Sequence, residues 1–349
     1  QELAQNYANL TLEQASVLVG AENFDPTVNT YTIQDLGSNY DNLTLEQASV
    51  LVGAENFEPT VNTYTIQDTL AIYDYVTYKY QFTDLTLAQA SVVHEAANAS
   101  QFTYTITIQD TLATYDTDTS KYQFSDLTLA QASVVHEAAN ASQFTYTIQE
   151  LGSNYDNITL AQASVIHEAA NASQFTYTIQ DTLAHLIDPQ YSSVLSGRTY
   201  MIQDLGSNYD NLTLEQASVL VGAENFEPTV NTYTIQDTLA IYDYVTYKYQ
   251  FTDLTLAQAS VVHEAANASQ FTYTITIQDT LATYDTDTSK YQFSDLTLAQ
   301  ASVVHEAANA SQFTYTIQEL GSNYDNITLA QASVIHEAAN ASQFTYTIQ

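Results

Sequence analysis

The sequence predicts an α/β solenoid, in which strand–helix repeats stack and share a parallel sheet. A phrase of the form Leu/Ile-Thr-Leu-Ala/Glu-Gln-Ala-Ser-Val begins at residues 10, 43, 85, 127, 158, 212, 254, 296 and 327. Most copies are followed by an alternating strand phrase such as Tyr-Thr-Ile-Gln. One short helix and one strand cannot bury their apolar faces alone, whereas stacked copies form a continuous core. A right-handed parallel β-helix is the alternative, because short connectors and threonine-rich strands also suit it.

The stretch from residue 85 to residue 110 is the best-formed copy and begins with a helix. Thr86 and Gln89 form a T-x-x-Q capping box ahead of an alanine-rich run, which favours a helix start. At about 100° per residue, one face of this helix is apolar and the other polar. The apolar face comprises Ala90, Val92, Val93, Ala96 and Ala97. In the first two copies Gly20 and Gly53 predict an earlier helix end.

A strand follows the helix, because the period of the sequence changes to two. Phe102, Tyr104, Ile106 and Ile108 alternate with threonine and glutamine. Strands joined by a helical crossover are expected to run parallel. We therefore expect aromatic and aliphatic side chains inward and a Thr/Gln face outward. The short connectors at residues 69–79 and 111–121 leave room for a turn or two.

The chain also repeats on a larger scale. Residues 33–180 and 202–349 are identical, and a divergent seam at residues 181–201 separates them. The seam carries Pro189 and the chain's single arginine, Arg198. We interpret residues 1–349 as one continuous repeat array.

Composition excludes several classes of partner. The chain has 40 acidic and 5 basic residues and a net charge of -35, so it offers no basic surface to nucleic acid or anionic membrane. No run approaches the roughly 18 apolar residues of a membrane span. The absence of cysteine excludes disulfides and thiolate metal sites.

The most regular polar feature is an aspartate at the end of successive strand phrases. Each carboxylate suits the cap of the following turn, as in Asp68-Thr69-Leu70-Ala71. Calcium is the alternative ligand, because it prefers oxygen donors and the chain is strongly acidic. The candidate metal-binding residues are Asp35, Asp68, Asp84, Asp110, Asp126 and Asp181.

Three other recurring features have simple structural interpretations. The histidines of the helices precede glutamate and are expected to form a solvated stripe; those of the first copy are His94, His136 and His167. Threonine rows such as Thr103, Thr105 and Thr107 suit an ordinary solvent-facing sheet, with an ice- or polysaccharide-binding face as the alternative. Eleven N-x-S/T sequons occur at helix ends, where asparagine has local uses. Among them are Asn42, Asn98, Asn140, Asn157 and Asn171.

In its tandem repeats, acidity and lack of cysteine, the chain resembles the repeat arrays of giant secreted bacterial adhesins and of surface-layer or extracellular filament proteins. The resemblance covers the whole chain and implies a structural protein at the cell surface or outside the cell. From the repeat array and the acidity we also expect self-association, end to end or laterally, with divalent cations or glycans as further partners. We expect no enzyme, because no nucleophile with a base and no glycine-rich phosphate loop is visible. No cofactor is expected apart from the calcium alternative.

Overall fold

A computed structural model describes residues 4–34, 36–149, 154–203, 205–318 and 323–349. The chain divides into two compact units, which are treated separately below. The first comprises Gln1–Asp156 and Ala161–Tyr177, and the second comprises Asn157–Leu160 and Thr178–Gln349.

The repeating element is a β-α-β unit, which confirms the predicted alternation of strand and helix. In the third repeat, β6 (Lys79–Leu85) leads into α3 (Leu87–Glu95), and β7 (Phe102–Ile106) returns parallel to β6. The predicted capping box is present, since Gln89 N–H donates to Thr86 Oγ1 and Thr86 N–H donates to Gln89 Oε1. Helices follow the first strand in the other repeats that the structure describes, so an all-β helix does not describe this part of the chain.

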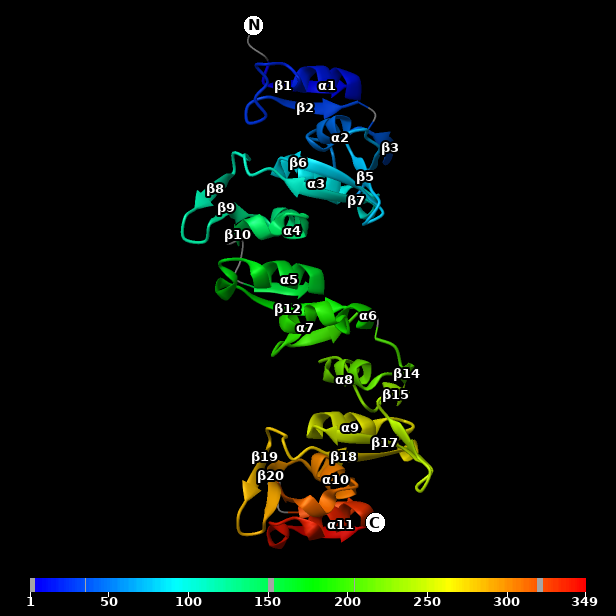
Figure 1. Cartoon of the computed structure of the whole chain (residues 1–349). Helices are drawn as coiled ribbons and strands as arrows, with labels where there is room; N and C mark the ends of the chain where they lie inside the picture. The colour runs from blue at the N-terminus through cyan, green and yellow to red at the C-terminus, as the bar shows by residue number, and fades with distance from the viewer. Residues whose placement is uncertain (1–3, 35, 150–153, 204, 319–322) are drawn as a thin grey trace. The chain divides into compact units, whose positions relative to one another are not determined.

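The first unit contains the following elements (Figure 1). They are β1 (Asn6–Leu10), α1 (Leu12–Val19), β2 (Thr30–Ile33), β3 (Asn39–Leu43), α2 (Leu45–Val52), β4 (Thr63–Ile66), β5 (Ile72–Asp74), β6, α3, η1 (Ala99–Gln101), β7, β8 (Ala113–Asp116), β9 (Lys121–Leu127), α4 (Leu129–Glu137), η2 (Ala141–Gln143), β10 (Phe144–Ile148), β11 (Asn154–Ile158), α5 (Leu160–Glu168) and η3 (Ala172–Gln174). Residues 157–160, which span the end of β11 and the start of α5, group with the second unit.

The second unit repeats this order after the seam. Its elements are β12 (Thr176–Asp181), α6 (Leu183–Leu186), η4 (Pro189–Tyr191), α7 (Ser192–Leu195), β13 (Tyr200–Ile202), β14 (Asn208–Leu212), α8 (Leu214–Gly222), β15 (Thr232–Ile235), β16 (Ile241–Asp243), β17 (Lys248–Leu254), α9 (Leu256–Glu264), η5 (Ala268–Gln270), β18 (Phe271–Ile275), β19 (Ala282–Asp285), β20 (Lys290–Leu296), α10 (Leu298–Glu306), η6 (Ala310–Gln312), β21 (Phe313–Ile317), β22 (Asn323–Ile327), α11 (Leu329–Glu337), η7 (Ala341–Gln343) and β23 (Thr345–Ile348).

The described strands form small sheets of two or three strands, whereas the sequence predicted one shared parallel sheet. The reason is visible at the outer edge of β7. Its carbonyl at Tyr104 accepts from the N–H of Ala139, which follows helix α4, so no strand of the next repeat pairs there. The small sheets are parallel or mixed, and the repeat-like arrangement of the fold is confirmed.

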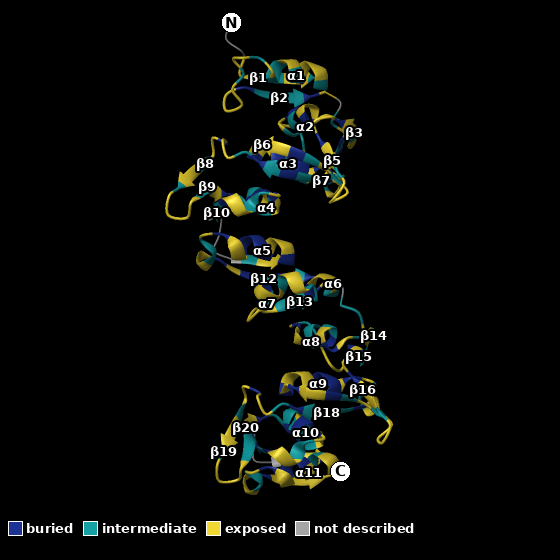
Figure 2. Ribbon diagram, in the orientation of Figure 1, coloured by how far each residue is buried: buried dark blue, intermediate teal, exposed yellow. Residues whose placement is uncertain are grey.

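The short connectors contain strands that the sequence analysis missed. β5 pairs antiparallel with β6, and β8 pairs antiparallel with β9, so each forms a hairpin. The same hairpins recur in the second unit as β16–β17 and β19–β20. Figure 2 shows that residues around β16 are largely exposed.

A left-handed residue interrupts the first strand of the β-α-β units outside the seam. In β6 this residue is Asp84, with φ of 56°, and the pairing register with β7 shifts at the same place. Its N–H donates to Thr105 Oγ1 at 2.9 Å. Asparagine tolerates this conformation better than most residues, and it occupies the position in the two-stranded repeats, as at Asn42. The threonine therefore fixes a bulge.

The ends of helices α1 and α2 agree with the sequence analysis, whereas strand β7 is shorter than predicted. Helices α1 and α2 end before Gly20 and Gly53, as predicted, although they are only one residue shorter than α3. β7 ends at Ile106 and Ile108 is 42% exposed, whereas the sequence predicted a strand through Ile108. The extra residues form a turn, in which Asp110 N–H donates to the Thr107 carbonyl.

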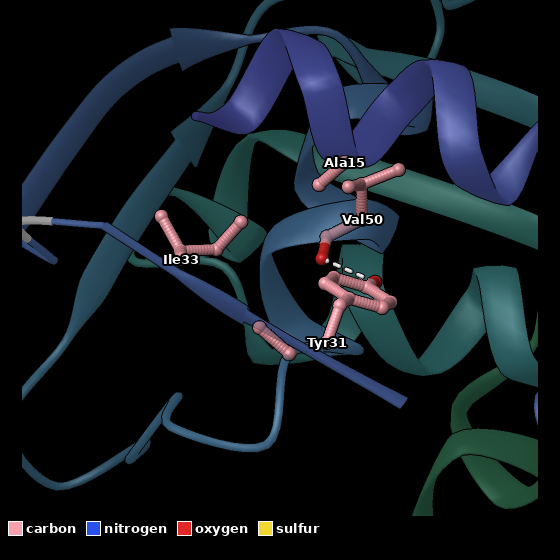
Figure 3. Close-up of a cluster of buried hydrophobic side chains, with 5 residues drawn as sticks. Ala15, Tyr31, Ile33 and Val50 are labelled. Carbon is pink, nitrogen blue, oxygen red and sulfur yellow. Dashed lines mark hydrogen bonds between the residues drawn. The ribbon is translucent and has the colours of Figure 1, made fainter. Parts of the chain in front are cut away.

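The core of each repeat lies between the helix and the second strand. In the first repeats Ala15, Tyr31, Ile33, Val50 and Ala54 form one buried cluster. Figure 3 shows that this cluster joins two repeats, because Tyr31 and Val50 belong to different ones. Packing between neighbours therefore continues the core from one β-α-β unit to the next.

Candidate functional site

The most regular arrangement of polar side chains lies at the junctions between successive repeats. The Tyr31 hydroxyl of β2 donates to the Val50 carbonyl of α2, one repeat further on, at 2.7 Å (Figure 3). The same bond recurs at distances of 2.7 to 3.0 Å. The pairs are Tyr64–Val92, Tyr104–Val134, Tyr146–Val165, Tyr200–Val219, Tyr233–Val261, Tyr273–Val303 and Tyr315–Val334.

At these junctions an asparagine that follows the helix forms the second part of the contact. Asn98 Oδ1 accepts from the N–H of Ile66 in the preceding repeat at 2.9 Å, and Asn98 Nδ2 donates to the Ile66 carbonyl at 2.9 Å. One amide thus satisfies both backbone groups of a buried strand residue. The equivalent residues are Asn56, Asn140, Asn171, Asn225, Asn267, Asn309 and Asn340.

A backbone bond completes each junction. Ala97 N–H donates to the Tyr64 carbonyl at 2.8 Å, between the tyrosine and asparagine contacts. Each junction therefore joins one strand to the next repeat through the backbone, a phenol and an amide. We call this set the junction clamp.

The sequence alone could not assign Tyr64 or Asn98 to the clamp, because their partners are 28 and 32 residues away. The recurrence of both residue types at fixed places was the available signal.

Six of the eleven sequons belong to the clamp. Their asparagine Nδ2 atoms lie 2.8 to 2.9 Å from a carbonyl oxygen of the preceding repeat. The structure thus gives Asn98, Asn140 and Asn171 the local role that the sequence suggested. An N-linked sugar on this nitrogen would have to be accommodated inside the junction. Asn42 and Asn157, by contrast, are bulge residues with φ near 55°.

Four helix histidines, His94, His136, His263 and His305, face the junctions, so the prediction of a solvated stripe is wrong for them. His167 and His336 are exposed, as predicted. His94 Nδ1 lies 3.1 Å from the Tyr104 hydroxyl and 3.6 Å from Glu137 Oε2 of the next helix. The His94 side chain is only 25% exposed. The same group recurs around His136, His263 and His305.

Burial of the clamp tyrosines raises their pKa values. Burial raises the pKa of Tyr31 to about 12. For Tyr104, burial is the larger cause and the nearby Glu137 carboxylate adds to it. A phenolate cannot donate to the Val134 carbonyl, so ionisation would break the clamp.

We therefore expect the folded chain to lose stability at alkaline pH. The folded tyrosines keep protons that the unfolded chain releases near pH 10, so their contribution to the free energy of unfolding is constant below that pH. It should fall as the pH rises from about 10 to about 12. Guanidinium denaturation midpoints at pH 8, 9, 10 and 11 measure this, and an equal midpoint at pH 9 and 11 would contradict it.

Three of the six predicted aspartates bind backbone N–H groups at a helix start. Asp110 Oδ2 accepts from Leu87 N–H, the first residue of α3, at 2.6 Å, and Oδ1 accepts from Leu112 N–H at 2.8 Å. Asp68 makes the same two contacts, with Leu45 and Leu70. The predicted cap of the following turn is confirmed, and the contact to the preceding helix is additional. A carboxylate there also complements the helix dipole.

Asp181 is the third of these aspartates and lies in the seam. It accepts from Leu160 N–H at 2.9 Å and contacts His185 Nδ1 at 2.7 Å. Burial opposes ionisation of Asp181, but these hydrogen bonds outweigh it and lower its pKa.

Asp84 and Asp126 do not cap a turn; both are exposed bulge residues with φ of 56°. The sequence pattern did not separate these residues from the capping aspartates, because strand phrases of both kinds end in Asp. Asp35, the sixth candidate, lies outside the described residues.

No group of three or more His, Asp or Glu side chains is arranged to hold a metal ion within the described part of the chain. The oxygens of Asp68 and Asp110 face N–H groups instead.

We accordingly expect neither a millimolar chelator nor added calcium to change the melting temperature. Thermal unfolding followed by circular dichroism checks this expectation. A fall in melting temperature with chelator, restored by calcium, would favour the metal interpretation of the aspartates.

Comparison with known proteins finds no matching family model, curated protein or solved structure. Across the residues that the structure describes, the helices are too short or too polar to cross a bilayer.

Proposed function

We propose that the chain is a structural repeat protein, an α/β solenoid that forms part of an extracellular filament, surface layer, matrix or adhesin stalk. The observation that carries the proposal is the junction clamp, which recurs in both compact units with the same residue types and bonds. Tyrosine, asparagine and histidine, the side chains most suited to chemistry, are used at these junctions to hold one repeat to the next.

Repetition also favours a structural role over catalysis. An active site needs a singular constellation of groups, whereas these polar residues recur and contact backbone groups. In solenoids, stability grows from interfaces between neighbours, so a long array suits a rod or stalk. The strong net negative charge would keep such an array soluble outside the cell.

Negative-stain electron microscopy of the purified chain over a range of concentrations tests the assembly part of the proposal. We expect ordered fibres or sheets, formed end to end or laterally, at high concentration. Discrete, monodisperse particles at every concentration would contradict the filament and surface-layer versions.

A further inference from the structure

One groove occurs in both compact units at the same place in the repeat. In the first unit it has a volume of about 640 Å³ and lies where the turn after β4 meets β6 and β7. In the second unit the corresponding groove has a volume of about 720 Å³ and is lined by the residues 169 positions later. Both volumes lie within the usual range for ligand sites, about 300 to 1,000 Å³.

The groove carries amide groups that the fold does not use. The side chains of Gln67 and Gln101 line it, are exposed, and make no hydrogen bond with the described residues. At the next junction the residue equivalent to Gln101 is Gln143, which accepts from Asn140 Nδ2 at 3.0 Å. In the second unit Gln270 resembles Gln101, whereas Gln312 accepts from Asn309 at 2.9 Å. The same amide is therefore available where the groove lies and engaged at the following junction.

A row of aromatic rings leads out of the groove. Phe102 and Tyr80 line it, with ring centroids 6.5 Å apart. The row continues along the hairpin from Tyr80 to Tyr73 at 5.1 Å and from Tyr73 to Tyr75 at 5.0 Å. Contacts between the rings hold Tyr80 in place although it is 45% exposed.

The neighbouring hairpin shows that this row is specific to one position. In β8–β9 only Tyr115 and Tyr122 pair, and the tip residues that follow are Asp-Thr-Asp-Thr-Ser. The tip of β5–β6 instead exposes Tyr75, Val76 and Tyr78, each more than three-quarters exposed. A hairpin that needs only to fold gains nothing from exposing these apolar groups.

We propose that this groove and the aromatic row bind a neutral polysaccharide, with one site in each compact unit. A pyranose ring presents apolar C–H faces that stack on aromatic rings and hydroxyl groups at its edge that bond to amides and carboxylates. Gln67 and Gln101 supply donors and acceptors. The row of rings suits a chain of sugars, and the net charge of -35 disfavours an anionic one. The site is distinct from the threonine rows and does not depend on the structural role proposed above.

The test begins with an array of neutral hexasaccharides built from glucose, mannose, galactose or N-acetylglucosamine, with heparin and alginate fragments as anionic comparisons. Isothermal titration of the full chain with the best neutral binder should give two equivalent sites. The variant Tyr80→Ala/Tyr249→Ala should weaken binding about tenfold. The variant Gln101→Ala/Gln270→Ala should weaken it about threefold to tenfold, as expected for a lost hydrogen bond.

Matched controls come from the adjacent hairpins. Tyr122→Ala/Tyr291→Ala and Gln143→Ala/Gln312→Ala remove the same residue types one repeat later and should leave affinity unchanged. Circular dichroism confirms that each variant is folded. The proposal is overturned if no neutral hexasaccharide binds at millimolar concentration, if only anionic fragments bind, or if the control variants lose binding while the groove variants keep it.

Discussion

Replacing Asp110 and its copy Asp279 by asparagine is expected to lower the free energy of unfolding by about 2 to 3 kcal/mol per site. Each carboxylate accepts from two backbone N–H groups; for Asp110 the donors are Leu87 and Leu112. Asparagine offers one acceptor oxygen, so its NH₂ group would face the other donor. Both aspartates are 6% exposed, and water cannot easily replace the lost bond.

The same substitution at Asp126 and Asp295 provides the matched control. These residues lie in β9 and β20 of the next repeats, and they are exposed and left-handed, with φ of 56°. Asparagine tolerates this conformation and already occupies the equivalent position at Asn42. We therefore expect no loss of stability. Guanidinium denaturation of both double variants makes the comparison, and equal destabilisation of the two would refute the distinction between cap and bulge.

Replacing Asn140 by alanine is expected to cost about 2 to 4 kcal/mol, because it leaves two buried backbone groups without partners. Asn140 Oδ1 accepts from the Ile106 N–H, and Asn140 Nδ2 donates to the Ile106 carbonyl. Ile106 is 1% exposed, so the strand backbone there is poorly placed to bind water.

Two further variants distinguish loss of the clamp contacts from an unspecific loss of stability. Gln143→Ala removes only an exposed partner of Asn140 and should change stability by less than about 0.5 kcal/mol. Asn140→Asp keeps the acceptor but loses the donor at neutral pH, and acidification should restore part of the loss by protonating the new carboxyl. Chemical denaturation at pH 7 and pH 4 checks these results. Equal stabilities for Asn140→Ala and Gln143→Ala would show that the amide does not hold the junction.

Local features of the fold followed from the sequence because their causes lie within a few residues. The Thr86–Gln89 capping box and the alternation of Phe102, Tyr104 and Ile106 are examples of such local patterns. The parallel pairing of β6 with β7 also followed, because a helix connects them. The turn cap at Asp68 was predicted correctly for the same reason.

The junctions and the groove could not be derived in this way. Asn98 resembles a helix-end residue or a sequon until the strand of the preceding repeat is placed beside it. His94 resembles a polar-face residue until Tyr104 and Glu137 surround it. The left-handed conformation of Asp84 depends on a donor–acceptor contact with Thr105, 21 residues later. Such contacts depend on stacking geometry, which a repeat pattern alone does not specify.

Amide hydrogen exchange in the full chain tests most directly the claim that the clamp holds neighbouring repeats together. Ile106 N–H donates to Asn140 and Ala139 N–H donates to Tyr104, so each reports on the two repeats of one junction. We predict slow exchange at both amides in the native chain, and faster exchange at both in Asn140→Ala, with the change extending into β7 and α4. Unchanged protection at Ala139, with faster exchange confined to Ile106, would contradict the account.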